Sequence, residues 1–203
     1  MLNVPLVLAS GSPRRIDLLN SMGLKPLVMR PDIEEKRNRG ETPQAYTKRL
    51  AFEKANEVVT ECLWKHAGAL IIAADTIVVA PNGKVLEKPS DTAEAVRMVS
   101  RLQGKTHTVH TGYCVLGVAR ETKTQKIVRC ITTKVTLRKL SKDGVRAYVQ
   151  KGESMDKAGA YAAQEHGELI IDRIEGSMTN VIGLPMDEVS EALRTEFGIS
   201  PAD

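Results

Sequence analysis

The chain has 203 residues, of which 42% are hydrophobic and 27% are charged, a composition that excludes a disordered or fibrous protein and allows a sizeable core. The formal net charge of +4 is too small to indicate a polyanionic partner. One Trp, four Tyr and two Phe are also too few for the stacking surfaces that bind single-stranded nucleic acid, so we expect no nucleic-acid partner.

In the first half of the chain, short β-branched runs alternate with amphipathic segments, which predicts an α/β fold. The expected elements are a strand at 6–9, a helix from Pro13 with Ser12 as N-cap and Gly23 as stop, a strand at 25–30, a charged loop at 31–41, a long helix from Thr42-Pro43 to about Cys62, and a buried central strand at 69–80 with a hairpin turn at 81–84.

The second half predicts a pair of long strands and several helices. The expected elements are a helix capped by Asp91 that ends at Gly104, strands at 108–119 and 127–137, a short helix from Ser141, a strand at 169–174 and a last helix from Pro185. No repeat or linker interrupts this order. We therefore predict a single domain over residues 1–203, built as two lobes.

The cysteines and the hydropathy pattern indicate a cytoplasmic protein. Cys62, Cys114 and Cys130 are odd in number and far apart, which favours reduced thiols over disulfides or a zinc site. The longest apolar run, residues 67–74, is too short to cross a bilayer. Because no basic residue precedes the apolar stretch at 5–9, that stretch does not resemble a secretory signal. We expect no membrane partner.

The most specific local motif is the turn SGSPRR at residues 10–15. A helix N-terminus presents unpaired N–H groups and favours anions, so Arg14 and Arg15 are unfavourably placed for helix stability. A Gly/Ser loop at a helix start, joined by two guanidinium groups, suits a polyphosphate. The alternative is a pair of solvated arginines without a functional role.

Two charged residues interrupt apolar patterns. Lys54 lies near the middle of the apolar stripe of its helix, where it either extends to the surface or points into a polar cleft. Asp75 interrupts the apolar run 70–80, either as a turn or capping residue or as a group that faces a cation. With Glu35 and Lys88 near the same strands, these residues are typical of a Mg²⁺–phosphate site.

Two histidines, His107 and His110, do not predict a metal site. They are three residues apart on an expected strand, so their side chains point to opposite faces. We expect both to be structural, with neither a zinc site nor histidine nucleophile chemistry.

Taken together, ordered blocks over nearly the whole chain resemble the Maf family, the septum-formation-inhibitor-like nucleoside triphosphate pyrophosphatases. The blocks are LASGSPRR at 8–15, IEE at 33–35, RLAFEK at 49–54, AADT at 73–76, LEKP at 86–89, THTVHTG at 106–112, DKAGAY at 156–161 with Gln164, and GLP at 183–185. The DKAGAY block with Gln164 resembles the branch that hydrolyses dTTP and UTP. Glu165 and His166 depart from the small, glycine-rich residues expected after the glutamine.

The resemblance implies hydrolysis of dTTP and UTP, or of modified pyrimidine nucleotides, to the monophosphate and pyrophosphate. It implies Asp75 as proton acceptor, Glu35 and Asp75 as ligands of a divalent cation (Mg²⁺ or Mn²⁺), substrate binding by Ser10, Arg14, Arg15, Lys54 and Lys88, and specificity positions at Arg14, Thr76 and Gln164. The implied fold is a mixed, twisted β-sheet flanked by helices, with a central cleft between two lobes, and the implied assembly is a homodimer.

A function of another class would use the same phosphate site. A nucleotide-binding regulator of cell division or septum formation, with little turnover, would also need the arginines and lysines. Only the enzyme would need Asp75.

Overall fold

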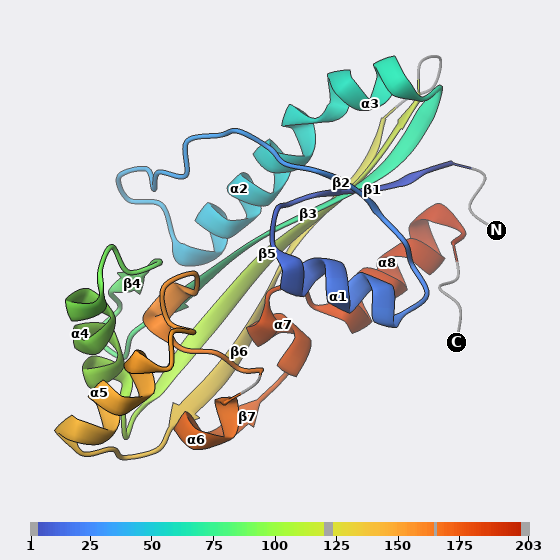
Figure 1. The fold of residues 1–203 in the computed structure, drawn as a ribbon. Helices are drawn as coiled ribbons and strands as arrows, with labels where there is room; N and C mark the ends of the chain where they lie inside the picture. The colour runs from blue at the N-terminus through green and yellow to red at the C-terminus, as the bar shows by residue number, and fades with distance from the viewer. Residues whose placement is uncertain (1–3, 120–123, 165, 200–203) are drawn as a thin grey trace. The chain divides into compact units, whose positions relative to one another are not determined.

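The computed structural model describes residues 4–119, 124–164 and 166–199, so Glu165 lies outside the described residues. Within these ranges the chain forms a seven-stranded mixed sheet flanked by helices, which confirms the predicted fold class (Figure 1). The strand order is β2-β1-β3-β5-β6-β7, and β4 pairs with β3. In the described residues, no helix is long and apolar enough to cross a membrane.

The strands lie close to their predicted positions. They are β1 (Leu6–Ala9), β2 (Leu27–Met29), β3 (Gly68–Val79), β4 (Val85–Leu86), β5 (Thr106–Ala119), β6 (Gln125–Leu137) and β7 (Ile171–Glu175). Strand β1 pairs in parallel with both β2 and β3, whereas β4 pairs antiparallel with β3, and β7 pairs antiparallel with β6. The predicted hairpin between β3 and β4 is therefore confirmed.

The helices follow the predicted caps. They are α1 (Pro13–Ser21), α2 (Pro43–Glu57), α3 (Val59–Lys65), α4 (Thr92–Leu102), α5 (Lys142–Gln150), α6 (Gly167–Ile170), α7 (Met178–Ile182) and α8 (Met186–Phe197), with a 3₁₀ turn η1 (Ala158–Ala160). Asp91 Oδ1 accepts a hydrogen bond from Glu94 N at 2.6 Å, and Ser141 Oγ accepts one from Gly144 N at 3.0 Å. Both residues are N-caps, as predicted.

Two predicted elements are wrong in part. The single helix expected to reach Cys62 ends at Glu57, and a second helix begins at Val59. Val58, Val59 and Thr60 are consecutive β-branched residues, which are poor helix formers, and the break falls among them. The strand expected from Leu169 begins only at Ile171, because residues 167–170 form a helical turn.

The chain divides into two compact units. The first comprises Met1–Asp75, Thr111–Ile131 and Gly183–Asp203, and the second comprises Thr76–His110 and Thr132–Ile182. Each unit has its own hydrophobic core. The assignment of residues 1–203 to one domain stays a prediction.

In the first unit, the central strands are buried on both faces, which explains their unbroken apolar sequence. On one face, Leu70, Ile72 and Ala74 of β3 pack with residues of α1 and α8. On the other face, Ala69, Ile71 and Ala73 pack with residues of α2 and α3. Figure 1 shows the positions of α2, α3 and β3. Because side chains alternate along a strand, odd-numbered residues of β3 face α2.

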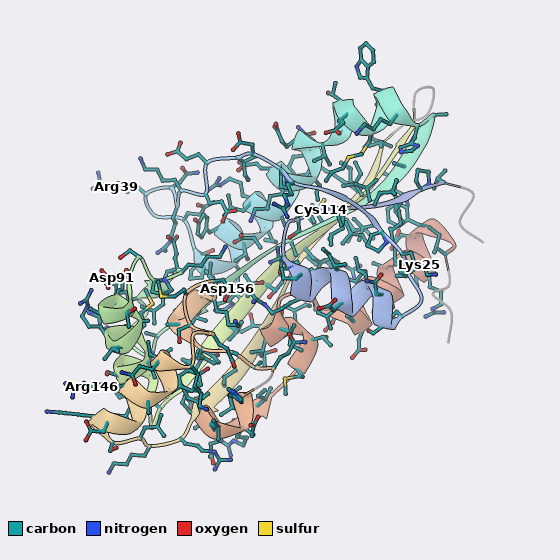
Figure 2. The ribbon with its side chains drawn as sticks, viewed as in Figure 1. Lys25, Arg39, Asp91, Cys114, Arg146 and Asp156 are labelled. Atoms are coloured by element: carbon teal, nitrogen blue, oxygen red, sulfur yellow. The ribbon has the colours of Figure 1, made fainter. Side chains whose placement is uncertain are left out.

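All three cysteines lie in this unit. Cys62 and Cys114 are buried free thiols in the core beneath α2 and α3, and Cys130 is a half-buried free thiol. Figure 2 marks the position of Cys114. Burial raises the pKa of the Cys114 thiol to about 12. These cysteines are therefore packing residues rather than reactive groups.

In the second unit, one core joins α4 and α5 to β5, β6 and η1. His107 and His110 of β5 are buried here. His107 Nε2 lies 2.6 Å from Tyr161 Oη, and the two ring nitrogens of His110 lie 2.8 and 3.0 Å from the hydroxyls of Thr132 and Thr108. Hydroxyl partners of this kind fit the structural role that we predicted for both histidines.

Candidate functional site

The turn between β1 and α1 presents the first part of the candidate site. Ser12 is the N-cap and Pro13 the first helical residue, and the first turn of α1 contains no acidic side chain. Ser12 N donates to Ser10 Oγ at 3.2 Å, so a hydrogen bond between the two serines stabilises the turn. No carboxylate of the first turn therefore binds the N–H groups at the start of α1. An anion-binding site requires such N–H groups to be accessible to the anion.

Arg15 is drawn inward rather than solvated. It is 9% exposed, its Nη1 donates to Ser10 Oγ at 3.0 Å, and its Nε donates to the Gly183 carbonyl at 2.8 Å. Burial lowers the pKa of the Arg15 guanidinium, and the negative charge of Asp75 opposes that shift. Arg15 is therefore not a solvated arginine, and this part of the alternative interpretation is wrong for it. Arg14 is half-buried, and its charge acts on Arg15.

The second part of the site is an ion pair between α2 and β3. Lys54 Nζ donates to Asp75 Oδ1 at 2.7 Å, and both side chains are less than a tenth exposed. Asp75 is an odd-numbered residue of β3 and therefore lies on the strand face that α2 covers. Lys54 accordingly points inward, and the alternative in which it extends to the surface is wrong.

Glu35 completes this cluster from the charged loop that precedes α2. Its Oε1 lies 2.7 Å from Lys54 Nζ, so one ammonium lies between two carboxylates. The Glu35 side chain is 51% exposed, whereas that of Asp75 is 7% exposed. The cluster therefore has an exposed carboxylate and a buried carboxylate, both in contact with the Lys54 ammonium.

A glycine sets the distance between α2 and the sheet. A Cβ atom on Gly112 of β5 would lie 2.3 Å from the carbonyl carbon and oxygen of Thr47 in α2. Only a residue without a side chain fits at this distance. Thr47 is fully buried, and its hydroxyl contacts the Gln44 carbonyl at 3.2 Å and Cys130 Sγ at 3.4 Å. Gly112 thus allows the close packing of the helix that carries Lys54.

The structure brings together six of the nine predicted site residues in the first unit. They are Ser10, Arg14, Arg15, Glu35, Lys54 and Asp75. The other three, Thr76, Lys88 and Gln164, belong to the second unit and are described there.

Within the second unit, these three residues have different surroundings. Thr76 is half-buried and follows Asp75 in β3, and Lys88 is exposed just after β4. Gln164 is half-buried and lies at the end of the segment 157–164. Hydrogen bonds from the backbone of this segment fix it to other parts of the second unit. Gly159 N donates to the Glu87 carbonyl at 3.1 Å, and Ala162 N donates to Tyr148 Oη at 2.9 Å.

Three residues beside the site, Glu41, Tyr46 and Arg49, are not marked as functional by the sequence alone. Arg49 belongs to one of the blocks that resemble the Maf family, but no role was assigned to it. Its helical spacing to Tyr46 and Glu53 was the available signal, because residues three and four apart are neighbours on a helix.

A family model described as "Maf-like protein" matches residues 5–196. The chain belongs to the Maf family. A relative from Geobacter metallireducens named "dTTP/UTP pyrophosphatase" is 45% identical over 95% of this chain and 96% of its own length. A Myxococcus xanthus protein of the same name is 45% identical over 90% of this chain and 88% of its own. These matches confirm the Maf resemblance.

One crystal structure is a more distant match to this Maf-family chain. That structure is of a nucleoside-triphosphatase / dITP/XTP pyrophosphatase from Mycobacterium abscessus, and the match covers 94% of this chain and 94% of that chain. The TM-score is 0.38 and the sequence identity is 15%.

Proposed function

We propose that this Maf-family chain is a nucleoside triphosphate pyrophosphatase that hydrolyses dTTP and UTP to the monophosphate and pyrophosphate. The observation that carries the proposal is the buried Asp75 carboxylate, held by Lys54 at 2.7 Å in the same unit as the arginine-rich turn. Relatives at 45% identity over 90% or more of the chain carry the name "dTTP/UTP pyrophosphatase", which supports the same reaction.

In the proposed reaction, a water oxygen bonds to the α-phosphorus while the bond from that phosphorus to the bridging α–β oxygen breaks. Asp75 accepts the proton that the water loses, and pyrophosphate is the leaving group. Arg14, Arg15, Lys54 and Lys88 bind phosphate oxygens and stabilise the negative charge on the leaving group. No covalent intermediate is required.

We assign Glu35 and Asp75 as the protein ligands of a divalent cation, Mg²⁺ or Mn²⁺. In the described residues, no group of three or more His, Cys, Asp or Glu side chains could hold a metal by itself. Two carboxylates that converge on one ammonium fit a hard cation that takes its remaining ligands from substrate phosphates and water. When bound, the cation would neutralise phosphate charge.

Base selection is assigned to Arg14, Thr76 and Gln164. The Gln164 amide offers one acceptor and two donor hydrogens, which complement the N3–H and O4 edge of thymine or uracil. A purine or cytosine would leave buried polar groups unmatched. Modified pyrimidines with the same edge would also be accepted. A homodimeric assembly and a cytoplasmic location stay predictions.

A panel of canonical and modified triphosphates tests the proposal, with pyrophosphate and orthophosphate detected separately. With Mg²⁺ or Mn²⁺ present, dTTP and UTP should give monophosphate and pyrophosphate in equal amounts. Orthophosphate with accumulating diphosphate would contradict attack at the α-phosphorus. Binding of these nucleotides with no turnover would favour the cell-division regulator.

A further inference from the structure

The charged loop before α2 has little regular structure of its own, although it carries Glu35. Residues 31–38 form neither helix nor strand. Backbone bonds within the loop include Lys36 N to the Glu34 carbonyl and Glu41 N to the Asn38 carbonyl, both at 3.1 Å. An exposed side chain on such a segment needs outside contacts to keep one position, because ordering a loop costs conformational entropy.

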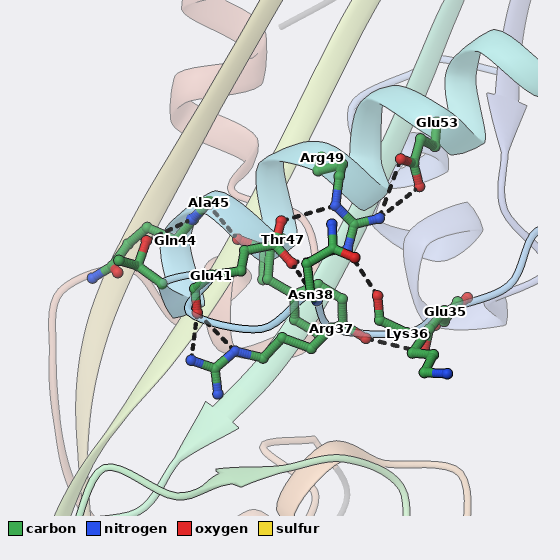
Figure 3. A network of polar contacts seen from close by, with 12 residues as sticks. Glu35, Lys36, Arg37, Asn38, Glu41, Gln44, Ala45, Thr47, Arg49 and Glu53 are labelled. Atoms are coloured by element: carbon green, nitrogen blue, oxygen red, sulfur yellow. Dashed lines mark hydrogen bonds and ion pairs between the residues drawn. The ribbon is translucent and has the colours of Figure 1, made fainter.

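Helix α2 supplies those contacts at the backbone of Glu35 and of the next residue (Figure 3). Tyr46 Oη donates to the Glu35 carbonyl at 3.1 Å, and Arg49 Nη2 donates to the Lys36 carbonyl at 2.8 Å. Tyr46 is 1% exposed and therefore well fixed. The helix that presents Lys54 thus also holds the backbone that presents Glu35.

Arg49 is itself held on both sides. Its Nε and Nη2 donate to the two carboxylate oxygens of Glu41 at 2.8 and 2.9 Å, a bidentate pair of the strong kind. Its Nη1 donates to Glu53 at 3.0 and 3.1 Å, and its guanidinium lies 5.5 Å from the centre of the Tyr46 ring. The Arg49 guanidinium therefore connects α2 both to Glu41, at the end of the loop, and to Lys36, in its middle.

Glu41 extends the connection within the loop. Its Oε2 accepts a hydrogen bond from Asn38 N at 3.0 Å, and its carbonyl accepts hydrogen bonds from the Arg37 guanidinium. The Glu41 side chain is 10% exposed, whereas that of Glu53 is 39% exposed. The Arg49–Glu41 contact thus fixes the loop, and the Arg49–Glu53 contact only links two residues of the same helix.

We infer that Arg49 is a positioning residue for Glu35: through the Lys36 carbonyl and Glu41 it holds the loop so that the Glu35 carboxylate stays at Lys54. The inference rests on the proposed function, in which Glu35 is a ligand of the divalent cation. It predicts that Arg49, which does not itself bind the cation, sets the cation affinity. Outer residues that orient metal ligands typically change metal affinity by about 10–100-fold when they are replaced.

Two disruptive variants and one matched control test this inference. Arg49→Lys keeps the charge but cannot form the bidentate pair and the carbonyl bond together. Glu41→Gln removes the carboxylate and leaves Arg49 in place. It therefore tests the same contact if the Arg49→Lys protein does not fold. Glu53→Gln is the control, because it removes an Arg49 contact that does not reach the loop.

The first measurement is the rate of trypsin cleavage after Lys36, Arg37 and Arg39, with the sites identified by mass spectrometry. The second is Mn²⁺ affinity, measured by electron paramagnetic resonance in the presence of α,β-imido-dUTP, which cannot be cleaved at the α–β position. Arg49→Lys and Glu41→Gln should be cleaved severalfold faster and bind Mn²⁺ about 10-fold more weakly. Glu53→Gln should match the wild type in both.

Glu35→Gln separates this inference from the proposed function. It should weaken Mn²⁺ binding at least as much as Arg49→Lys does, and adding Arg49→Lys to it should cause little further loss. Loop cleavage that rises without any change in Mn²⁺ affinity would overturn the positioning role, as would an equal effect of Glu53→Gln. Unchanged Mn²⁺ affinity in Glu35→Gln would overturn it too, whereas the wild type's own turnover of dTTP tests the pyrophosphatase assignment independently.

Discussion

Lys54 Nζ and Asp75 Oδ1 lie 2.7 Å apart, although Lys54 is on the buried, largely apolar face of α2 and Asp75 interrupts the apolar strand β3. A charge buried in such surroundings is costly unless it is paired, and here each charge has the other as its partner. Glu35 adds a second carboxylate to the same ammonium. One lysine therefore contacts both an exposed carboxylate and a buried one. Stability of the fold alone does not require this arrangement.

Replacing Asp75 by Asn should abolish most turnover and preserve nucleotide binding. The amide keeps the shape of the carboxylate but cannot accept the proton, and loss of a general base typically lowers the rate by about 10²–10⁴-fold. The affinity for dTTP should fall much less, because the arginines and lysines remain. The rate of pyrophosphate release and the affinity from calorimetry check both halves.

The control for this variant is the melting temperature, which must show a folded protein before kcat is interpreted. Nearly full activity of Asp75→Asn would mean that another group accepts the proton, or that turnover is incidental to a regulatory function.

The Lys54–Asp75 pair should also be coupled in stability. Lys54→Met should lower the free energy of unfolding by about 3–5 kcal/mol, because it leaves a buried carboxylate without its closest cation. Asp75→Asn should be destabilising too, but the double variant should lose clearly less than the two single losses together. Urea denaturation without nucleotide measures all four proteins.

Lys65→Met provides the comparison, because Lys65 and Glu61 form an exposed pair on α3. Exposed pairs contribute about 0–1 kcal/mol, so this variant should be nearly neutral. Additive losses at Lys54 and Asp75 would show that the two side chains are not energetically coupled.

Local motifs in the sequence predicted much of the fold. The SGSPRR turn and Asp91 mark helix starts that the structure confirms, because capping depends on residues a few positions apart. The alternation of β3 shows which residues share a face, but the pairing of Asp75 with Lys54 needs the packing of α2 onto the sheet. That packing depends on Gly112, which is far from both in sequence.

The contacts of the 31–41 loop could not be predicted from the sequence for a related reason. Many charged residues are available in the loop and on α2, and their spacing allows several pairings. The observed one depends on loop backbone geometry, since Arg49 binds the Lys36 carbonyl as well as the Glu41 carboxylate. The break at Val58 was missed because a hydrophobic stripe continues across it.

Gly112→Ala should be destabilising and should reduce activity through α2. A Cβ atom 2.3 Å from the Thr47 backbone forces the helix away from β5, and overpacking of this kind typically costs about 1–3 kcal/mol. The Lys54–Asp75 contact should loosen in consequence. Thermal unfolding and kcat measure the two effects.

Gly144→Ala is the matched change, because Gly144 lies in the first turn of α5, where its nearest neighbour is the Ser141 hydroxyl at 3.3 Å. Alanine favours a helix over glycine by about 0.5–1 kcal/mol, so this variant should be neutral or stabilising. If Gly112→Ala behaved in the same way, the close approach of α2 would not be rigid.

His107 should make the second unit sensitive to acid. Burial lowers the pKa of His107 to about 4, below its ordinary value of 6.5, so the folded state keeps a neutral imidazole that the unfolded state protonates. The free energy of unfolding should therefore fall as the pH drops from about 6.5 to about 4, by up to about 3 kcal/mol from this residue. Above pH 6.5 this contribution should be constant.

Urea denaturation between pH 4.5 and 7.5 measures this dependence in the wild type and in His107→Asn. The His107 variant should lose part of the pH dependence. Burial also lowers the pKa of His110, so some dependence should remain in His107→Asn. Equal pH profiles for the wild type and His107→Asn would contradict the prediction.

Gln164→Leu should weaken the preference for thymine and uracil nucleotides. Leucine has a similar size but offers neither donor nor acceptor, so kcat/KM for UTP should fall by about 10-fold or more, as expected for one or two lost hydrogen bonds. The kcat/KM values for CTP and GTP should change less, because these bases do not match the glutamine in the wild type. Measuring kcat/KM for UTP, dTTP, CTP and GTP in both proteins gives the ratio directly. Gln150→Leu, at the end of α5, controls for the loss of an amide elsewhere in the same unit. Equal losses on all four nucleotides would assign Gln164 to the fold or to the phosphates, and base selection would then fall to Arg14 and Thr76.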